Sequence, residues 1–161
     1  MFQVYYDRVS LGREKVMLEY STTIKNDDFP TSLRGSFERD RILTYTTVGV
    51  HRDELNLSLE GYPVKKLGSQ GQKKSFLTAL KLAQFAYLVK QKGVKPLLLL
   101  DDIFDKLDAD RVSQIIQIVS STDFGQVFVT DTNREHIDEI LQQHAMEYKI
   151  FHVERGEVMD L

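Results

Sequence analysis

Four consecutive leucines followed by two aspartates constrain this chain more than any other stretch. The leucines occupy positions 97–100, directly after Pro96, and Asp101 and Asp102 follow them. A short, fully apolar run of this kind is typical of a strand in the centre of a parallel sheet, which is covered on both faces. In open α/β sheets, ligands bind at the carboxyl ends of the strands. The run therefore predicts an α/β fold that presents two carboxylates at a ligand-binding edge.

The second half of the chain alternates helical and strand patterns, which supports this class of fold. Residues 74–89 carry apolar side chains around a wide face and predict a long, mostly buried helix. The expected order continues with a strand at 97–100, a helix at 110–120, a strand at 126–130, a helix at 134–144 and a strand at 148–153. Such a βαβαβ order predicts right-handed crossovers and a mostly parallel sheet flanked by helices. A turn at 155–157 is expected to lead into a last strand at 158–161.

The first half of the chain predicts strands near the N-terminus and one short helix. Strands are expected at residues 1–6, 15–24, 45–50 and 55–59, the last two as a hairpin pattern that stops at Glu60 and Gly61. Pro30 marks the start of the helix, which is expected to continue over residues 33–43. These strands predict an antiparallel edge beside the parallel sheet of the second half.

Composition and charge exclude several classes of protein. The chain has no cysteine, which removes disulfide frameworks and zinc–thiolate sites and fits a reducing compartment such as the cytoplasm. The 28% of charged residues nearly balance to a formal net charge of -3, so the bulk charge does not favour nucleic acid. No stretch reads as a signal peptide or a membrane span, and no membrane partner is expected. We expect a single cytoplasmic unit over residues 1–161, in which residues 1–44 are a candidate for the end of a second lobe.

The two aspartates after the leucine run are expected to have different roles. Adjacent residues of a strand point in opposite directions, so both carboxylates serve one site only where the chain leaves the sheet. In phosphoryl-transfer sites, one acid holds Mg2+ and another orients or deprotonates the attacking water. We therefore expect Asp101 to bind the metal and Asp102 to be the catalytic residue that acts on water. The alternative is an exposed strand end with two solvated aspartates.

A glycine-containing stretch precedes the long predicted helix. It reads Gly68, Ser69, Gln70, Gly71, Gln72 and then two lysines. Ser69 is suited to cap the helix, the glycines let an anion approach the main chain, and the helix start adds unpaired N–H groups. The stretch is therefore a candidate phosphate site, with an ordinary serine-capped loop as the alternative. Lysines 65, 66, 73 and 74 form a basic cluster that is suited either to DNA or phosphate or to a solvated rim.

Together, these two stretches resemble the signature and Walker B motifs of ABC ATPases in order and spacing. Residues 105–108 follow where that superfamily has its D-loop, with Asp108 as the usual aspartate. Residues 127–131 are similar to the strand that leads to the switch histidine, but Asp131 stands at the histidine position. Asp102 stands where a glutamate is more common. The resemblance implies that the nucleotide contacts come from Ser69, Gln70, Gly71, Gln72, Asp108 and Asp131.

Within that superfamily, the segment before the glycine-containing stretch is similar to an element of the RecF family of DNA-repair proteins. Residues 49–55 read Gly-Val-His-Arg-Asp-Glu-Leu and resemble the family's GPHRDDL, with departures at Val50 and Glu54. Both a packing role and a functional role stay open for this element. The resemblance covers residues 39–157 and implies the C-terminal half of an ABC ATPase head. It also implies ATP and Mg2+ as cofactors, an ATP-dependent homodimer, single-stranded or gapped duplex DNA as a partner, and work with RecR and RecO.

One part of a complete ABC head is missing from the sequence. The loop GxxxxGK[ST], whose lysine and backbone amides hold the phosphates of ATP, occurs nowhere in the 161 residues. In the RecF family that loop lies near the N-terminus of a longer chain, so the resemblance implies a C-terminal portion. The intact protein is then expected to be a slow Mg2+-dependent ATPase, and this portion alone is expected to be inactive. The alternatives are a non-catalytic interaction module and the head fragment of another SMC-like protein.

Overall fold

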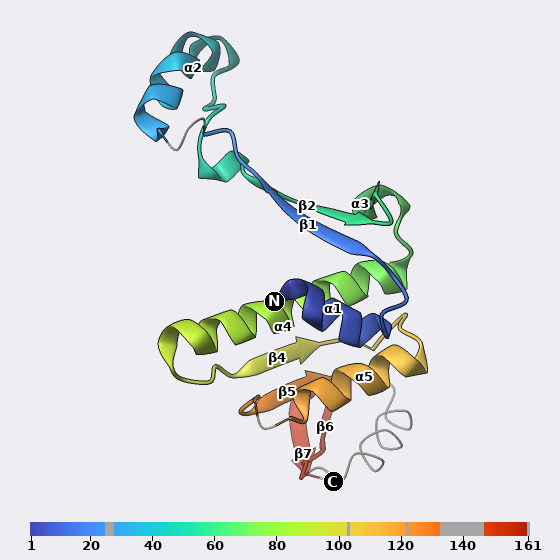
Figure 1. Cartoon of the computed structure of the whole chain (residues 1–161). Coiled ribbons are helices and arrows are strands. Elements are labelled where there is room, and N and C mark those ends of the chain that lie inside the picture. The colour runs from blue at the N-terminus through green and yellow to red at the C-terminus, as the bar shows by residue number, and fades with distance from the viewer. Residues whose placement is uncertain (25–27, 103, 122, 133–146, 161) are drawn as a thin grey trace. The chain divides into compact units, whose positions relative to one another are not determined.

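The chain folds into helices and strands that group into two compact units. A computed structural model (Figure 1) describes residues 1–24, 28–102, 104–121, 123–132 and 147–160. Its elements are α1 (Phe2–Ser10), β1 (Val16–Ser21), α2 (Phe29–Leu43), the 3-10 helix η1 (Val50–Arg52), β2 (Glu54–Leu59), β3 (Tyr62–Pro63), α3 (Val64–Leu67), α4 (Gln70–Lys92), β4 (Leu98–Asp101), α5 (Ala109–Val119), β5 (Val127–Thr130), β6 (Phe151–Glu154) and β7 (Glu157–Asp160). The larger unit contains Met1–Gly12 and Lys74–Leu161, and the smaller unit is Arg13–Lys73. The hypothesis of a single unit, with residues 1–44 as the end of a second lobe, stays a prediction.

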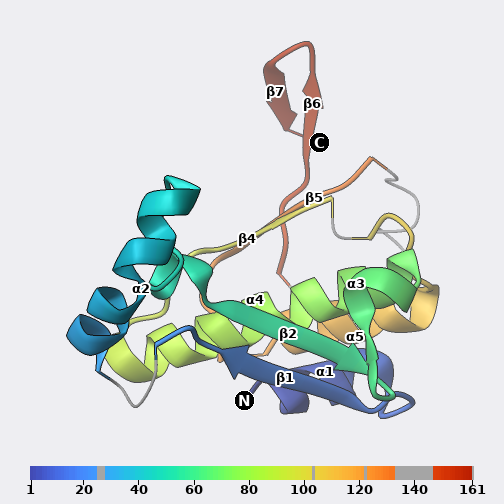
Figure 2. The ribbon, with the colours of Figure 1, turned by 90° about the horizontal axis from the view of Figure 1, so that it is seen from above.

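An antiparallel sheet organises the smaller unit. Strand β2 pairs with β1 on one side and with β3 on the other, and Figure 2 shows the long β1–β2 ribbon. The turn between β2 and β3 consists of Glu60 and Gly61, which both have positive φ angles of 48° and 81°. Two successive positive φ angles are typical of the two-residue turns that match the twist of a hairpin. The strands predicted at 15–24 and 55–59 and the antiparallel pairing near the N-terminus are therefore confirmed, although β1 is shorter than predicted. These strands form a sheet of their own instead of an edge of the parallel pair.

Helix α2 and the segment after it depend on aspartate side chains. The Oδ1 atom of Asp28 accepts a hydrogen bond from the backbone N–H of Thr31 at 3.2 Å, so the helix begins at Phe29, earlier than predicted. The Oδ1 atom of Asp40 accepts hydrogen bonds from the backbone N–H of Thr47 at 2.9 Å and from its hydroxyl at 2.5 Å. This tether holds the segment in bends beside the helix. The strand predicted at 45–50 is therefore wrong.

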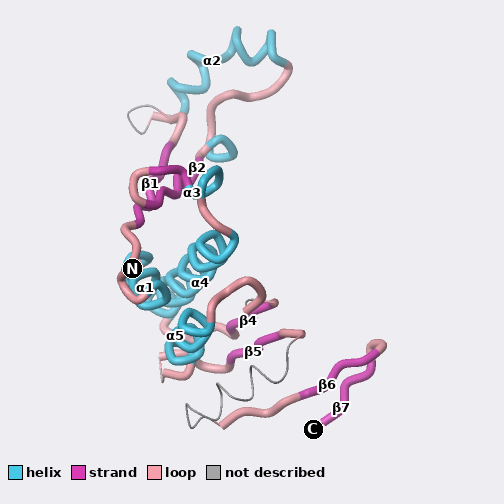
Figure 3. The backbone as a smooth tube through the Cα atoms, turned by 90° about the vertical axis from the view of Figure 1, so that its right-hand side faces the viewer, coloured by secondary structure: helices cyan, strands magenta, loops and turns pink. Residues whose placement is uncertain are grey.

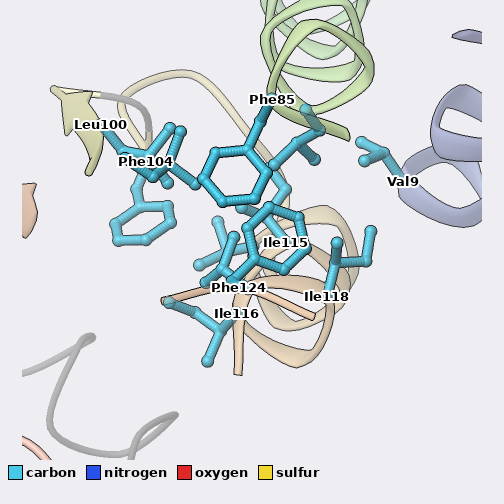
Figure 4. Packing of buried hydrophobic residues seen from close by; sticks show 12 residues of the cluster. Val9, Phe85, Leu100, Phe104, Ile115, Ile116, Ile118 and Phe124 are labelled. Atoms are coloured by element: carbon cyan, nitrogen blue, oxygen red, sulfur yellow. The ribbon is translucent and has the colours of Figure 1, made fainter. Parts of the chain in front are cut away.

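In the larger unit, helices α1, α4 and α5 cover one face of the parallel pair β4–β5 (Figure 3). Their buried side chains form the main core together with the two inward residues of β4 (Figure 4). The rings of Phe85 on α4 and Phe124, which follows α5, stack with their centroids 4.6 Å apart. The long helices predicted from periodicity at 74–89 and 110–120 are confirmed, and α4 begins earlier, at Gln70.

The strand predicted at residues 1–6 is wrong, because these residues open helix α1. Phe2, Tyr6 and Val9 recur at helical spacing, and all three are buried. The rings of Phe2 and Tyr6 lie 5.4 Å and 4.7 Å from the ring of Phe76 on α4, measured between centroids. Aromatic contacts with α4 therefore stabilise the helical conformation of this segment.

The leucine run forms β4 as predicted, but only one face of the strand is covered within the described residues. Leu98 and Leu100 are buried, whereas Leu99 is 63% exposed. Its register partner on β5, Phe128, is 46% exposed. Paired residues of parallel strands share a face, so these two side chains form an open apolar surface, here called the open face.

The end of the described chain is a hairpin. Strands β6 and β7 pair antiparallel across a turn at Arg155 and Gly156, so the turn and the last strand are confirmed. The strand predicted at 148–153 begins later, at Phe151, and pairs with β7 instead of extending the parallel pair. The helix predicted at 134–144 lies outside the described residues. Within the described part of the chain, no helix has the length and apolar character needed to cross a membrane.

The difference in burial between the two faces of β4 leads to a prediction about stability. Leu100 is 1% exposed, so Leu100→Ala leaves a cavity and should lower the free energy of unfolding of the chain by about 2–5 kcal/mol. The matched control Leu99→Ala on the open face should change it by about 0.5 kcal/mol. Urea unfolding followed by circular dichroism measures both values. Equal losses in the two variants would contradict the one-sided packing of β4.

A second prediction concerns the dependence of stability on pH. The hydrogen bonds from Thr47 hold the pKa of Asp40 below its ordinary value, against the opposing effect of desolvation. A carboxylate whose pKa is lowered by folding stabilises the protein above the pKa of its unfolded state, about 3.9. That contribution is lost as the pH falls through the lower, folded-state pKa. The urea midpoint should therefore fall on acidification below about pH 4.

The variant Asp40→Asn tests whether Asp40 causes the loss of stability at acid pH. Its amide oxygen still accepts a hydrogen bond from Thr47 but does not titrate. Its urea midpoint should fall less on acidification than that of the unmodified chain. The control Glu38→Gln, which changes an exposed carboxylate on the same helix, should leave the decline unchanged. An identical decline in all three proteins would show that Asp40 does not contribute to it.

Candidate functional site

Asp101 is the last residue of β4, at the carboxyl edge of the parallel pair. Its Oδ1 atom accepts a hydrogen bond from the hydroxyl of Thr130, its register partner on β5. Both side chains are exposed. The neighbouring strand thus orients the carboxylate at the edge where ligands bind in α/β sheets. The sequence analysis did not predict a role for Thr130. Its position at the end of the next predicted strand could have suggested a contact with Asp101.

At Asp102 the chain leaves the sheet. This residue has a φ angle of 47°, in the left-handed region, which costs a non-glycine residue about 1–2 kcal/mol. Its backbone N–H lies 3.1 Å from both the carbonyl oxygen and the hydroxyl oxygen of Thr130, and its carbonyl oxygen accepts a hydrogen bond from Lys74 Nζ. Because the chain leaves the sheet here, the carboxylates of Asp101 and Asp102 can both serve one site. Strained backbone that is fixed on both sides is typical of functional positions.

The loop after the acid pair leads to Asp108, which caps helix α5. Its Oδ1 atom accepts from the backbone N–H of Arg111 at 2.9 Å, and its Oδ2 atom accepts from Arg111 Nε at 3.1 Å. Arg111 also donates from Nη1 to the hydroxyl of the buried Ser75 at 2.6 Å. The structure thus gives Asp108 a capping role, and the expected contact with a nucleotide stays a prediction.

Asp131 follows Thr130 directly and is half-buried. It therefore lies at the same edge of the parallel pair as Asp101 and Asp102. Three acids predicted as site residues, Asp101, Asp102 and Asp131, thus lie at the ends of two adjacent strands. This is the arrangement expected for a site at the carboxyl edge of a sheet.

The donors at this edge fit Mg2+ only together with other ligands. Within the described residues, no group of three or more His, Cys, Asp and Glu side chains is placed to hold a metal ion. Mg2+ in phosphoryl-transfer sites usually takes one or two carboxylates and completes its shell with waters and phosphate oxygens. A single exposed carboxylate such as that of Asp101 suits this mode of binding.

The glycine-containing stretch lies in the smaller unit and opens helix α4. Ser69 and Gln72 form a capping box, in which the N–H of Gln72 donates to Ser69 Oγ at 3.2 Å and the N–H of Ser69 donates to Gln72 Oε1 at 2.9 Å. Gln72 Nε2 also donates to Glu14 Oε1 at 3.0 Å. The predicted capping role of Ser69 is therefore confirmed. Gln70 and Gly71 follow it as the first two residues of the helix.

Gly68 has a packing function that the sequence interpretation missed. A β-carbon at this position would lie 2.8 Å from the carbonyl oxygen of Val64, an atom of helix α3. The N–H of Gly68 donates to that same oxygen at 2.9 Å. Gly68 is the C-cap of α3, and a side chain there would collide with the backbone of the helix that it ends.

The RecF-like element at residues 49–55 makes contacts that stabilise its own loop. Asp53 accepts a hydrogen bond from the hydroxyl of Tyr20, which lowers the pKa of Asp53 and raises the pKa of Tyr20. His51 Nε2 lies 3.0 Å from the carbonyl oxygen of Thr46. The guanidinium of Arg52 lies over an aromatic ring, with its carbon 4.8 Å from the centroid. The packing role left open by the sequence is therefore present in the structure.

Known proteins with similar sequences cover the whole chain. No family model matches it. The DNA replication and repair protein RecF of Parabacteroides distasonis is 52% identical over 161 residues, which are 100% of this chain and 44% of that relative. RecF of Bacteroides thetaiotaomicron is 48% identical with the same coverage, and RecF of Flavobacterium johnsoniae is 46% identical over 153 residues, 95% of this chain and 43% of the relative. The chain thus spans less than half the length of these relatives.

Two solved structures share the fold. They are described as the recombination mediator protein RecF-ATPrS and RecF-ATP in the RecFOR pathway, and both have a TM-score of 0.67. Their identities are 23% and 24%, and they cover 99% of this chain and 43% and 44% of their own chains. The predicted α/β fold class is therefore confirmed, because the chain shares the fold of part of these RecF structures. The whole sequence of this chain is therefore similar to RecF proteins, and the match covers less than half of their own length.

Proposed function

We propose that this chain is the C-terminal part of a RecF protein and supplies half of a nucleotide site to an ATP-dependent homodimer. The observation that carries the proposal is the pair Asp101 and Asp102 at the carboxyl edge of β4–β5, where the chain turns out of the sheet at a left-handed residue. This is the position of the acids that hold the metal and the water in phosphoryl-transfer sites. The match to RecF-ATP structures supports a nucleotide as the ligand of this fold.

In this proposal, Asp101 binds Mg2+ and Asp102 orients the attacking water. The metal, when bound, neutralises charge on the phosphate oxygens. The carboxylate of Asp102 is the general base that accepts the proton of the water as the water oxygen attacks the phosphorus. This carboxylate is exposed, and the backbone of Asp102 is held by Thr130 and Lys74, so the group is accessible and fixed in direction. Asp108 and Asp131 contribute to the surroundings of the nucleotide. The expected γ-phosphate sensor is altered, since Asp131 carries no imidazole.

The start of α4 is the proposed contact with the ATP held by a second protomer. The N–H groups at the first turn of a long helix and the adjoining glycines attract an anion. The residues assigned to this contact are Ser69, Gln70, Gly71 and Gln72. Ser69 and Gln72 satisfy each other in the capping box, so a phosphate would meet a preformed turn.

The remainder of the nucleotide site is proposed to come from a preceding part of the same protein. The 161 residues contain no GxxxxGK[ST] loop, and the relatives are more than twice as long as the matched region. The open face, with Leu99 and Phe128, supports the same inference, because exposed apolar surface of a sheet usually packs against another layer. We therefore expect the intact protein to be a slow Mg2+-dependent ATPase and this chain alone to be inactive.

The proposed partners follow from the family. We infer that the intact protein works in the cytoplasm, binds single-stranded or gapped duplex DNA, and acts with RecR and RecO. The similar solved structures are of RecF in the RecFOR pathway, which supports this inference. The net charge of -3 means that DNA contacts of this part would be local.

A non-catalytic interaction module is the second candidate. The missing phosphate loop and Asp131 at the position of the switch histidine favour it. The two candidates differ in what the acid pair does, so variants of the acids in the full-length protein separate them.

Substitution of the acid pair should separate binding from hydrolysis in the full-length protein. Asp102→Asn should lower kcat by about 10²–10⁴-fold with the Kd for ATP changed less than about threefold, because a general base is lost. Asp101→Asn should weaken Mg2+-dependent ATP binding. Steady-state hydrolysis and titration with a fluorescent ATP analogue measure these effects. Asp123→Asn, at an exposed acid distant in sequence, is the control. Unchanged hydrolysis in both acid variants would contradict the roles of the acids, whereas a wild-type protein that does not hydrolyse ATP would favour the non-catalytic module.

The assignment of the α4 start predicts a separate effect on dimerisation. In the full-length protein, Ser69→Arg should leave ATP binding by the monomer within about threefold, since the partner's nucleotide is the proposed ligand, while the lost cap costs about 1 kcal/mol. ATP-driven dimerisation, measured by multi-angle light scattering, should be abolished. Gln91→Arg, an exposed change at the other end of the helix, should dimerise normally. Normal dimerisation of Ser69→Arg would exclude this contact.

A further inference from the structure

Lys74 differs from the other lysines of the basic cluster at 65, 66, 73 and 74. Its side chain is only 22% exposed, whereas residues 65, 66 and 73 are exposed. Lys74 Nζ donates to the carbonyl oxygens of Asp102 and of Asp105, the latter at 2.9 Å. It also lies 3.8 Å and 4.0 Å from the carboxylates of the same two residues. The lysine is therefore bound to the loop between Asp102 and Asp108, here called the acid loop, instead of forming part of a solvated rim.

The contact to Asp102 fixes a conformation that the residue does not favour by itself. The left-handed turn is held on its N–H side by Thr130 and on its carbonyl side by Lys74. Removing one of the two restraints releases the carbonyl of a strained residue. The direction of the Asp102 carboxylate, which starts from that backbone, would then vary.

The residue after Lys74 holds the other end of the same loop. The hydroxyl of Ser75 accepts from Arg111, and Arg111 in turn donates to the carboxylate of Asp108. Two consecutive residues of α4 thus fasten the acid loop at both ends. Lys74 makes the contact at the end that carries the proposed catalytic acid.

We infer that Lys74 is a positioning residue for ATP hydrolysis, which holds the backbone of Asp102 so that its carboxylate meets the attacking water. The inference rests on the proposed ATPase function. It assigns Lys74 no contact with the nucleotide, because its ammonium group is engaged with the two carbonyl oxygens. The loss of Lys74 should therefore affect the chemical step more than the binding of ATP.

The test uses the full-length protein and three substitutions at one position. Lys74→Met and Lys74→Gln keep much of the length but lose the double contact, so kcat should fall about tenfold or more, since small misplacements of a catalytic group are costly. The Kd for ATP should stay within about threefold of the wild-type value, because Lys74 makes no nucleotide contact. Lys74→Arg keeps the charge and several N–H donors on a long side chain, so it should retain more of kcat than Lys74→Met or Lys74→Gln. Lys90→Met, at an exposed lysine of the same helix, is the control.

The outcomes distinguish failure of the proposed ATPase function from failure of the role proposed for Lys74. If the wild-type protein does not hydrolyse ATP, the ATPase proposal itself is contradicted. If hydrolysis survives Asp102→Asn, the catalytic role of Asp102 is contradicted, and the inference on Lys74 fails with it. If Asp102→Asn abolishes hydrolysis but a folded Lys74→Met or Lys74→Gln variant stays within about twofold of wild type in kcat, Lys74 does not position the acid. Equal losses of ATP affinity and kcat would show a general structural role and also overturn the inference. Melting temperatures are measured first, and assays run below the lowest of them.

Discussion

The burial of one face of strand β4 is the constraint on which the rest of the site depends. Leu98 and Leu100 pack into the core formed with α1, α4 and α5, and this packing fixes where the strand ends. The parallel pairing with β5 then brings Thr130 beside the last residue of β4. Asp101 and Asp102 are thus placed by a hydrophobic core that has no chemical function of its own. The polar contacts at the edge refine a position that packing has already set.

The elements that were predicted correctly have a clear hydrophobic pattern within their own residues. The periodicity of α4 and α5 and the leucine run of β4 extend far enough to separate a helix from a strand. The two wrong strands are short and depend on distant partners. Residues 1–6 form a helix because Phe2 and Tyr6 pack against Phe76, and residues 45–50 bend because Asp40 binds Thr47. A six-residue window contains neither partner.

The same distinction applies to the candidate site. The acid pair and the cap by Ser69 could be predicted, because residue type and neighbouring sequence determine both. Thr130, Lys74 and Arg111 act through contacts between elements that are far apart in the sequence. Their roles depend on how β5, α4 and α5 pack, which no local pattern states. The sequence therefore predicted the side chains that are proposed to act on the nucleotide. The residues that hold these side chains in place could be found only from the fold.

The central claim is that this chain carries the acids and the helix start of a nucleotide site whose phosphate loop lies in another part of the protein. The most direct measurement mixes this chain with the separately produced N-terminal remainder of the full-length protein and titrates a fluorescent ATP analogue with and without Mg2+. The account predicts that neither part binds tightly alone and that the mixture binds in a Mg2+-dependent manner. Tight binding by this chain alone, or a mixture that binds no better than its separate parts, would contradict it.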